Sequence, residues 1–298
     1  MLDDTNMPLF ALMDKDVAIP IVRIVTDKAT DKKVTEIFQQ QFEYFKSHYD
    51  QEIEFYAGYS PRYNECFFLD DFDEALPLID AINRNTAIPK LDHKKIPMSG
   101  IKCLFVCTAF PNSPDKIAIQ SFNKGQILNI DRSLWLSKKT FSMMDGVGFN
   151  LDDKLVAVIE GKTIKFKSFQ RLRSIFDMEK YFSEATDDDV KSFSQHCKFK
   201  TEVGFDLLSV ADTVVRTKIT LINNSGVLDI DLKKLKSAAK KVKFDLKTTT
   251  DASGVEVIAM PTTKKEIKNL LTFLDEDYFT SEISKTIYRS NSKRPVNK

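Results

Sequence analysis

The chain has 298 residues, of which 42% are hydrophobic and 29% are charged, with 23 Phe against only 9 Gly and 10 Pro. This length allows one large domain or two modest ones, and this composition excludes a disordered, collagen-like or low-complexity chain. The sequence has no apolar run of about 18 residues, and its acidic N-terminus lacks the basic and apolar regions of a signal peptide. We therefore expect a cytoplasmic protein with no membrane span of its own.

The first hundred residues show the patterns of both strands and helices. Strands are predicted at Val17–Val25, Ile53–Tyr59 and Glu65–Leu69, and helices at Lys33–Tyr49, with Asp31 as N-cap, and at Phe72–Ile82. Residues 84–100 follow with two Pro, one Gly and no clear period. Such a stretch is typical of a connection, and we predict a boundary between two domains there.

The remainder of the chain changes from strands to helices. Strands are predicted at Ile101–Phe110, Lys116–Phe122, Gln126–Asn129, Phe141–Phe149 and Lys154–Phe166. Helices are predicted at Phe169–Phe176, Phe182–Cys197, Thr213–Ile222, Asp231–Val242 and Thr263–Leu274. Strands followed by helices predict an α+β fold. It would comprise a mixed strand–helix region over residues 1–100, then an antiparallel-rich sheet and a mainly helical C-terminal part within residues 101–298.

The formal net charge of +1 hides an asymmetry along the chain. Residues 1–100 hold 18 acidic and 11 basic side chains, a net of −7, whereas residues 232–298 hold 15 basic and 8 acidic ones, a net of +7. Such a chain can offer two surfaces to different partners, although solvated faces also explain the charges. The acidic region is a candidate docking surface for a partner protein.

Motifs for catalysis are weak. The chain contains neither a phosphate-binding P-loop nor a dinucleotide-binding glycine fingerprint, and no His lies in a recognisable triad context. The acidic run Asp70–Glu74 and the Glu160–Lys162 sequence could belong to a metal-dependent nuclease. A helix start explains the acidic run better, however, and a hairpin turn explains Glu160–Lys162 equally well. We predict no catalytic residue, no metal site and no cofactor.

The predicted helix at residues 231–242 carries the clearest signal for binding. Its apolar residues fall on one side, and six lysines cover the remaining arc: Lys233, Lys234, Lys236, Lys240, Lys241 and Lys243. Ammonium groups arranged in this way can neutralise phosphates without reading a base sequence. A solvated helix face is the alternative interpretation.

A second basic group lies near the end of the chain. Arg289, Lys293 and Arg294 flank Ser290, Asn291 and Ser292 in a sequence that favours a turn. Three cations beside hydroxyl and amide groups could contact DNA phosphates. The same turn could instead cap the domain.

Several stretches of the second half resemble a known family. They are Phe122–Ile130 (FNKGQILNI), Phe169–Tyr181 (FQRLRSIFDMEKY), and residues 264–296, which contain the acidic-aromatic turn LDEDYF and the later YRSNSKR. Over about residues 115–296 the chain resembles the DUF4868 family, whose members include the cytoplasmic component of Kiwa, a two-gene bacterial anti-phage system.

The resemblance implies a non-catalytic effector of phage defence that binds duplex DNA with little sequence preference. It also implies a homodimer that acts with a small transmembrane partner and is recruited by it from the cytoplasm to the inner membrane. Two other functions remain open: a metal-dependent nuclease, and a protein–protein adaptor that does not bind DNA.

Overall fold

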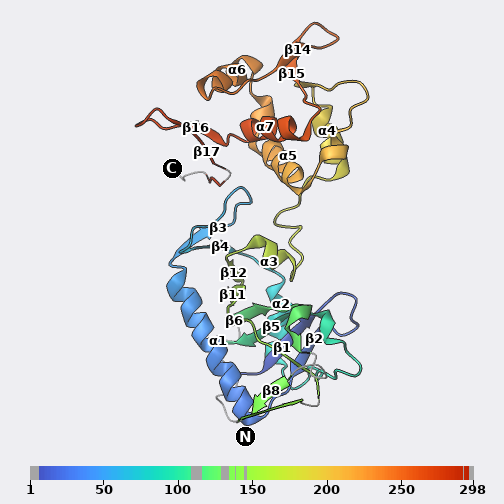
Figure 1. Ribbon diagram of the computed structural model, residues 1–298, viewed down its shortest axis with the longest axis vertical. Coiled ribbons are helices and arrows are strands. Elements are labelled where there is room, and N and C mark those ends of the chain that lie inside the picture. The colour runs from blue at the N-terminus through green and yellow to red at the C-terminus, as the bar shows by residue number, and fades with distance from the viewer. Residues whose placement is uncertain are drawn as a thin grey trace. The chain divides into compact units, whose positions relative to one another are not determined.

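The computed structural model describes residues 7–108, 116–128, 134–137, 139–143, 146–290 and 292–294. It divides the chain into two compact units (Figure 1). Unit 1 comprises Met1–Phe55 and Pro61–Met178, and unit 2 comprises Tyr56–Ser60 and Glu179–Lys298. Helices and strands occur in both units, which confirms the predicted α+β class.

Unit 1 is built on one eight-stranded sheet in the order β2-β1-β5-β6-β11-β12-β4-β3. Its strands are β1 (Leu9–Met13), β2 (Ile21–Ile24), β3 (Gln51–Glu54), β4 (Glu65–Leu69), β5 (Ile101–Cys107), β6 (Lys116–Ser121), β11 (Ala157–Glu160) and β12 (Thr163–Phe166). Neighbouring strands are antiparallel except for β3 and β4, which are parallel. The predicted antiparallel-rich sheet is therefore present, but it includes strands from the first hundred residues.

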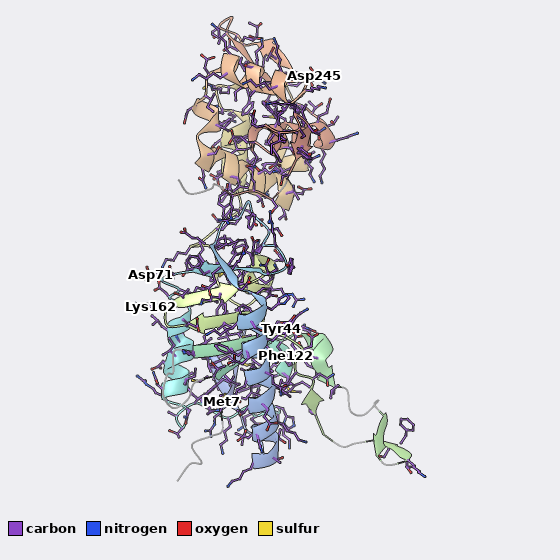
Figure 2. The ribbon with its side chains drawn as sticks, turned by 90° about the vertical axis from the view of Figure 1, so that its left-hand side faces the viewer. Met7, Tyr44, Asp71, Phe122, Lys162 and Asp245 are labelled. Atoms are coloured by element: carbon purple, nitrogen blue, oxygen red, sulfur yellow. The ribbon has the colours of Figure 1, made fainter. Side chains whose placement is uncertain are left out.

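The long helix α1 (Lys28–His48) crosses this sheet (Figures 1 and 2). Its Val34, Phe38 and Phe42 recur at the spacing of one helix face, and they join a buried cluster with Leu104 of β5 and Val158 of β11. The helix begins earlier than predicted, because Asp27 rather than Asp31 caps it by accepting a hydrogen bond from the Thr30 backbone at 2.9 Å. Burial of one helix face against the sheet fixes this core.

The described residues of unit 1 also form four short strands and two short α-helices. They are β7 (Ile127–Leu128), β8 (Leu134–Ser137), β9 (Thr140–Met143), β10 (Gly148–Phe149), α2 (Ala75–Asn83) and α3 (Phe169–Arg173). α2 begins three residues later than predicted, because the preceding residues form tight turns, in which the Ala75 backbone donates to the Phe72 carbonyl at 3.1 Å.

Unit 2 is a smaller layer of helices around a three-stranded sheet. It contains α4 (Asp187–Ser194), α5 (Thr213–Ser225), α6 (Leu232–Lys241), α7 (Lys264–Leu274), β13 (Phe199–Lys200), β14 (Thr248–Thr250) and β15 (Glu256–Ala259). A separate hairpin pairs β16 (Tyr278–Thr280) with β17 (Ile287–Arg289). Val215 and Ile219 of α5 and Leu271 of α7 lie in its buried cluster. Helices predominate here, as the sequence predicts for the C-terminal part.

The predicted domain boundary at residue 100 is wrong. The β5 strand that follows it pairs with β1, so the chain crosses that point inside one sheet. The preceding segment also packs on unit 1, since Ile96 is buried and the Arg23 backbone donates to the Pro89 carbonyl at 2.8 Å. Proline and glycine there mark a loop within the unit, and the division instead falls between Met178 and Glu179.

Candidate nucleic-acid interface

The helix α6 forms as its sequence predicts. Asp231 caps its N-terminus by accepting a hydrogen bond from the Lys233 backbone at 2.6 Å. Leu235 and Ala239 are buried in the core of unit 2, and Leu232 and Val242 pack against the same core. These four residues recur every three to four positions, so one stripe of the helix is docked and the rest faces water.

Five of the six predicted lysines are exposed. We call them the α6 lysines: Lys233, Lys234, Lys240, Lys241 and Lys243. At 1.5 Å per residue the helix is about 15 Å long, and duplex DNA carries one charge per 1.7 Å of its axis, so several phosphates could lie along it. The geometry therefore provides a compact cationic surface held by a buried stripe.

The sixth lysine is already paired. The Lys236 ammonium lies 2.7 Å from the Glu256 carboxylate of β15, and the Thr248 hydroxyl of β14 donates to the same oxygen at 2.6 Å. The hydrogen bond from Lys236 lowers the pKa of Glu256, so this acid stays ionised. Lys236 is thus a less available phosphate ligand than the α6 lysines, a difference that its own helix pattern did not indicate.

Two further lysines lie close to α6 and were missed in the sequence. The Lys198 ammonium donates to the carbonyl of Ile230, the residue before the helix cap. Lys200 of β13 donates to the Thr250 carbonyl at 2.6 Å, across the sheet that α6 adjoins. Their positions depend on the parallel pairing of β13 with β15, which no local pattern reveals. Lys198 therefore adds a cation at the start of α6, and Lys200 adds one on the three-stranded sheet.

The three cations predicted near the C-terminus each contact a neighbouring group, although Arg289 and Arg294 remain exposed. Arg289 donates to the Thr272 hydroxyl at 3.3 Å, and its guanidinium lies 5.9 Å from the centre of the Tyr278 ring. Lys293 donates to an Asp277 carboxylate oxygen at 2.7 Å and to the Asp275 carbonyl. Arg294 lies over the Tyr59 ring, at 5.7 Å. Asn291 lies outside the described residues.

Lys293 belongs to a cluster that we call the buried ion-pair cluster: Lys218, Asp275, Asp277 and Lys293. The Lys218 ammonium lies 2.7 Å from both carboxylates, whose side chains are only 8% and 2% exposed. Burial acts to lower the pKa of Lys218, but hydrogen bonds to the two carboxylates raise it above its ordinary value. Two buried acids thus require two bases, and the C-terminal segment supplies the second one. This arrangement supports the capping interpretation of the turn.

The two acidic motifs considered for a nuclease lie close together at one end of the large sheet. Figure 2 shows Asp71 beside Lys162, and Thr163 donates to Asp70 at 2.6 Å. Glu160, however, is bound by Lys165 at 2.7 Å and by Lys46 at 3.4 Å. Across the part of the chain that the structure describes, no group of three or more His, Cys, Asp or Glu side chains could hold a metal ion.

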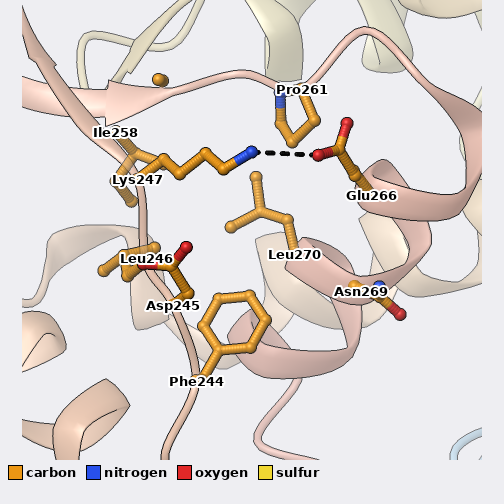
Figure 3. Close-up of a pocket in the computed structure, with 10 residues that line it drawn as sticks. Phe244, Asp245, Leu246, Lys247, Ile258, Pro261, Glu266, Asn269 and Leu270 are labelled. Carbon is orange, nitrogen blue, oxygen red and sulfur yellow. Dashed lines mark hydrogen bonds and ion pairs between the residues drawn. The ribbon is translucent and has the colours of Figure 1, made fainter.

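Two pockets of moderate size occur in unit 2. One, of about 240 Å³, has Leu270, Ile258 and Phe244 among its lining residues, and Lys247 and Glu266 point toward one another beside it, 3.0 Å apart (Figure 3). The other, of about 270 Å³, lies between α6 and the start of β16, where Lys234 and Tyr278 are among its lining residues. The second pocket shows that the hairpin base lies beside the α6 lysines.

Comparisons of the chain with protein-family models, with curated proteins and with solved structures found no match. No helix within the described residues is both long and apolar enough to cross a membrane.

Proposed function

We propose that unit 2 binds duplex DNA without sequence preference and that the α6 lysines are its main phosphate contacts. The observation that carries this proposal is a set of four exposed lysines on one helix, with a fifth just beyond its end, while the apolar stripe of the helix is buried. Phosphate contacts of this kind supply affinity but no base information, so binding would depend on salt rather than on sequence. The net charge of unit 2 is small, with 21 basic and 18 acidic residues. The proposal therefore depends on the clustering of the α6 lysines and not on the charge of the whole unit.

The biological role follows from the resemblance to the DUF4868 family. In this proposal the chain is a non-catalytic effector of anti-phage defence that works in the cytoplasm as a homodimer. A small transmembrane protein of the same system recruits it to the inner membrane. Expressed alone, the protein should remain in the supernatant after membrane sedimentation, and co-expression with the membrane protein of the adjacent gene should move it to the pellet. Sedimentation of the protein expressed alone would contradict recruitment.

The DNA-binding proposal is tested by removing the charge of four α6 lysines. The variant carries Lys233→Gln, Lys240→Gln, Lys241→Gln and Lys243→Gln, and Gln is nearly as good a helix former as Lys. If each lysine contacts one phosphate, affinity for a short duplex in 0.1 M salt should fall about 10³-fold. Fluorescence anisotropy with two duplexes of unrelated sequence should give the same loss for both.

A matched control removes the same charge from unit 1. Lys32, Lys33, Lys94 and Lys95 are exposed, and their replacement by Gln should leave affinity nearly unchanged. Equal losses in the two variants would mean that net charge, and not the α6 surface, governs binding. Unchanged binding by the α6 variant would place the DNA contacts elsewhere. Incubation of plasmid DNA with Mg²⁺ and the wild-type protein checks for cleavage, and nicking would support the nuclease alternative.

A further inference from the structure

The β16–β17 hairpin is an ordered projection from unit 2. Its strands pair Tyr278 with Arg289 and Thr280 with Ile287. The turn is closed by backbone hydrogen bonds from Ser281 to the Thr286 carbonyl at 3.0 Å and from Lys285 to the Ser281 carbonyl at 2.9 Å. These bonds hold the turn residues in one conformation, so the apex is a defined structural feature.

The base of the hairpin is fixed to the body of the unit. Arg289 donates to Thr272 at the end of α7, and the Ser290 backbone donates to the Asp277 carbonyl at 2.8 Å. Lys293 then binds the Asp277 carboxylate at 2.7 Å. With both strands anchored and the turn closed, the hairpin acts as a stiff arm.

Three large apolar side chains of the arm are exposed to water. Ile283 at the apex is 97% exposed, and Phe279 and Tyr288 on the outer face are 50% and 46% exposed. The two rings stack on each other with their centres 5.5 Å apart. Glu282 and Lys285 beside the apex lie 2.7 Å apart, so the charges next to Ile283 balance. An apolar tip with no net charge is suited to enter an apolar environment.

The arm starts beside the α6 lysines. Lys234, Leu235 and Ala238 of α6 line the same pocket as Tyr278, the first residue of β16, and Figure 1 shows the hairpin extending away from this point. Three strand steps carry the chain about 10 Å from Tyr278 to Ser281, and the turn residues with Ile283 follow. The minor groove of DNA is about 7.5 Å deep, so the arm is long enough to reach the base stack of a duplex held along α6.

We infer that the hairpin inserts Ile283 between base pairs of DNA bound along α6 and thereby bends the duplex. This inference rests on the proposed DNA binding. Isoleucine is one of the side chains that proteins use as wedges in the minor groove, where partial unstacking kinks the duplex. Burial of one side chain offsets much of the cost of unstacking, so insertion is favoured where the stack opens easily, at pyrimidine–purine steps or at a nick.

The test measures bending and the preference for a nick. A duplex of about 30 base pairs with a dye at each end reports bending as energy transfer, since wedge insertion bends DNA by roughly 20–90°. Wild-type protein should raise the transfer and bind a centrally nicked duplex at least tenfold more tightly than an intact one. Ile283→Ala should abolish both effects while its affinity for the intact duplex stays within threefold of wild type. Ile283→Met should retain them, because Met also serves as a wedge.

Val203→Ala is the matched control, because Val203 is a fully exposed apolar residue of another loop in unit 2. It should behave as wild type, and all variants should unfold at the same denaturant concentration. If wild type bound DNA in a salt-dependent way without a rise in energy transfer, insertion of Ile283 would be overturned and the DNA-binding proposal would stand. Absence of binding by wild type would overturn both. A change in the sedimenting mass of Ile283→Ala without a change in bending would overturn the wedge and make the hairpin a contact between copies.

Discussion

The α6 lysines and the C-terminal cations are similar in the sequence and different in the folded protein. Both are short basic groups within a segment of net charge +7. On α6, an apolar stripe docks the helix and leaves five ammonium groups in water. Near the C-terminus, Lys293 instead neutralises Asp275 and Asp277, and Arg289 anchors a hairpin. The difference indicates that a cation is less available to a phosphate when an acid, a hydroxyl or a ring of the fold already holds it.

Lys236 and Lys268 extend this comparison to intermediate cases. Lys236 lies on the same helix as the α6 lysines, but Glu256 holds it. Lys268 and Lys264 both bind Asp212, at 2.6 and 3.0 Å. Within one basic segment, some lysines are therefore exposed to water and others are held in ion pairs with acids of the fold. The following predictions test that ranking.

The largest effect is expected inside the buried ion-pair cluster. Lys218→Met leaves two buried carboxylates with only Lys293, and removal of one partner from a buried pair costs about 3–5 kcal/mol of unfolding free energy. Lys234→Met, on the exposed face of α6, should cost less than about 0.5 kcal/mol. Urea unfolding of both variants measures the difference, and equal stabilities would show that the cluster does not require Lys218.

Release of Lys236 should strengthen DNA binding. Glu256→Gln removes the acid that holds this lysine, and one additional phosphate contact would steepen the plot of log K against log salt by about 0.9. At 0.1 M salt the affinity should rise roughly 5- to 10-fold. Glu36→Gln removes an acid from α1 in unit 1 and should have little effect. If both variants gained affinity equally, the loss of negative charge alone would account for the change.

Asp212 should make stability depend on acid pH. The hydrogen bond from Lys268 holds the pKa of Asp212 well below its usual range, with a smaller contribution from Lys264. A lowered folded-state pKa contributes stability above pH 3.8, and this contribution is lost as pH falls further toward the folded-state value. Asp212 also caps α5, a role that Asn can keep.

Asp212→Asn therefore isolates the charge from the cap. Wild type should exceed the variant by about 1 kcal/mol near neutral pH, and the gap should close below pH 4. Denaturant unfolding between pH 2 and pH 7 measures it. A gap that stays constant over this range would mean that the ion pairs contribute nothing.

The smallest effect is expected at the end of α6. Lys243 has a φ of 54°, in the left-handed region that favours glycine at a helix C-terminus. Lys243→Gly should raise the unfolding free energy by about 0.5–1 kcal/mol while removing one phosphate contact. Lys241→Gly, within the last turn of the helix, removes the same charge but should lower stability by about 1 kcal/mol. Opposite changes in stability with similar losses of DNA affinity would separate the effect of Lys243 on helix termination from its contact with phosphate. Parallel changes in stability would show that the left-handed conformation of Lys243 carries no cost.

Local patterns predicted the elements better than their assembly. The stripe of Leu235 and Ala239 follows from spacing within one helix, and the structure confirms it. The strand β1 was not predicted, because it has only five residues and its position between β2 and β5 depends on a strand about 90 residues later. For the same reason, the loop before β5 was mistaken for a domain boundary.

The candidate site was predictable only in part. The six lysines of α6 are visible in the sequence, but their availability is not. Glu256 lies 20 residues from Lys236 in the sequence, and Asp275 lies 57 residues from Lys218. Whether a lysine is held in an ion pair therefore depends on contacts that only the fold creates. The prediction for Lys293 as a phosphate ligand overlooked the adjacent acidic turn, whose Asp277 is buried and needs a cation.

The most direct test of the ranking compares two double variants with equal losses of charge. One carries Lys233→Gln and Lys240→Gln on α6, and the other carries Arg289→Gln and Arg294→Gln near the C-terminus. For each, log K for a duplex is plotted against log salt between 0.05 and 0.3 M. We predict that the α6 variant lowers the slope by about 1.8 and that the C-terminal variant lowers it by less than about 0.5. The reverse order would show that the C-terminal cations, and not the α6 lysines, contact the phosphates.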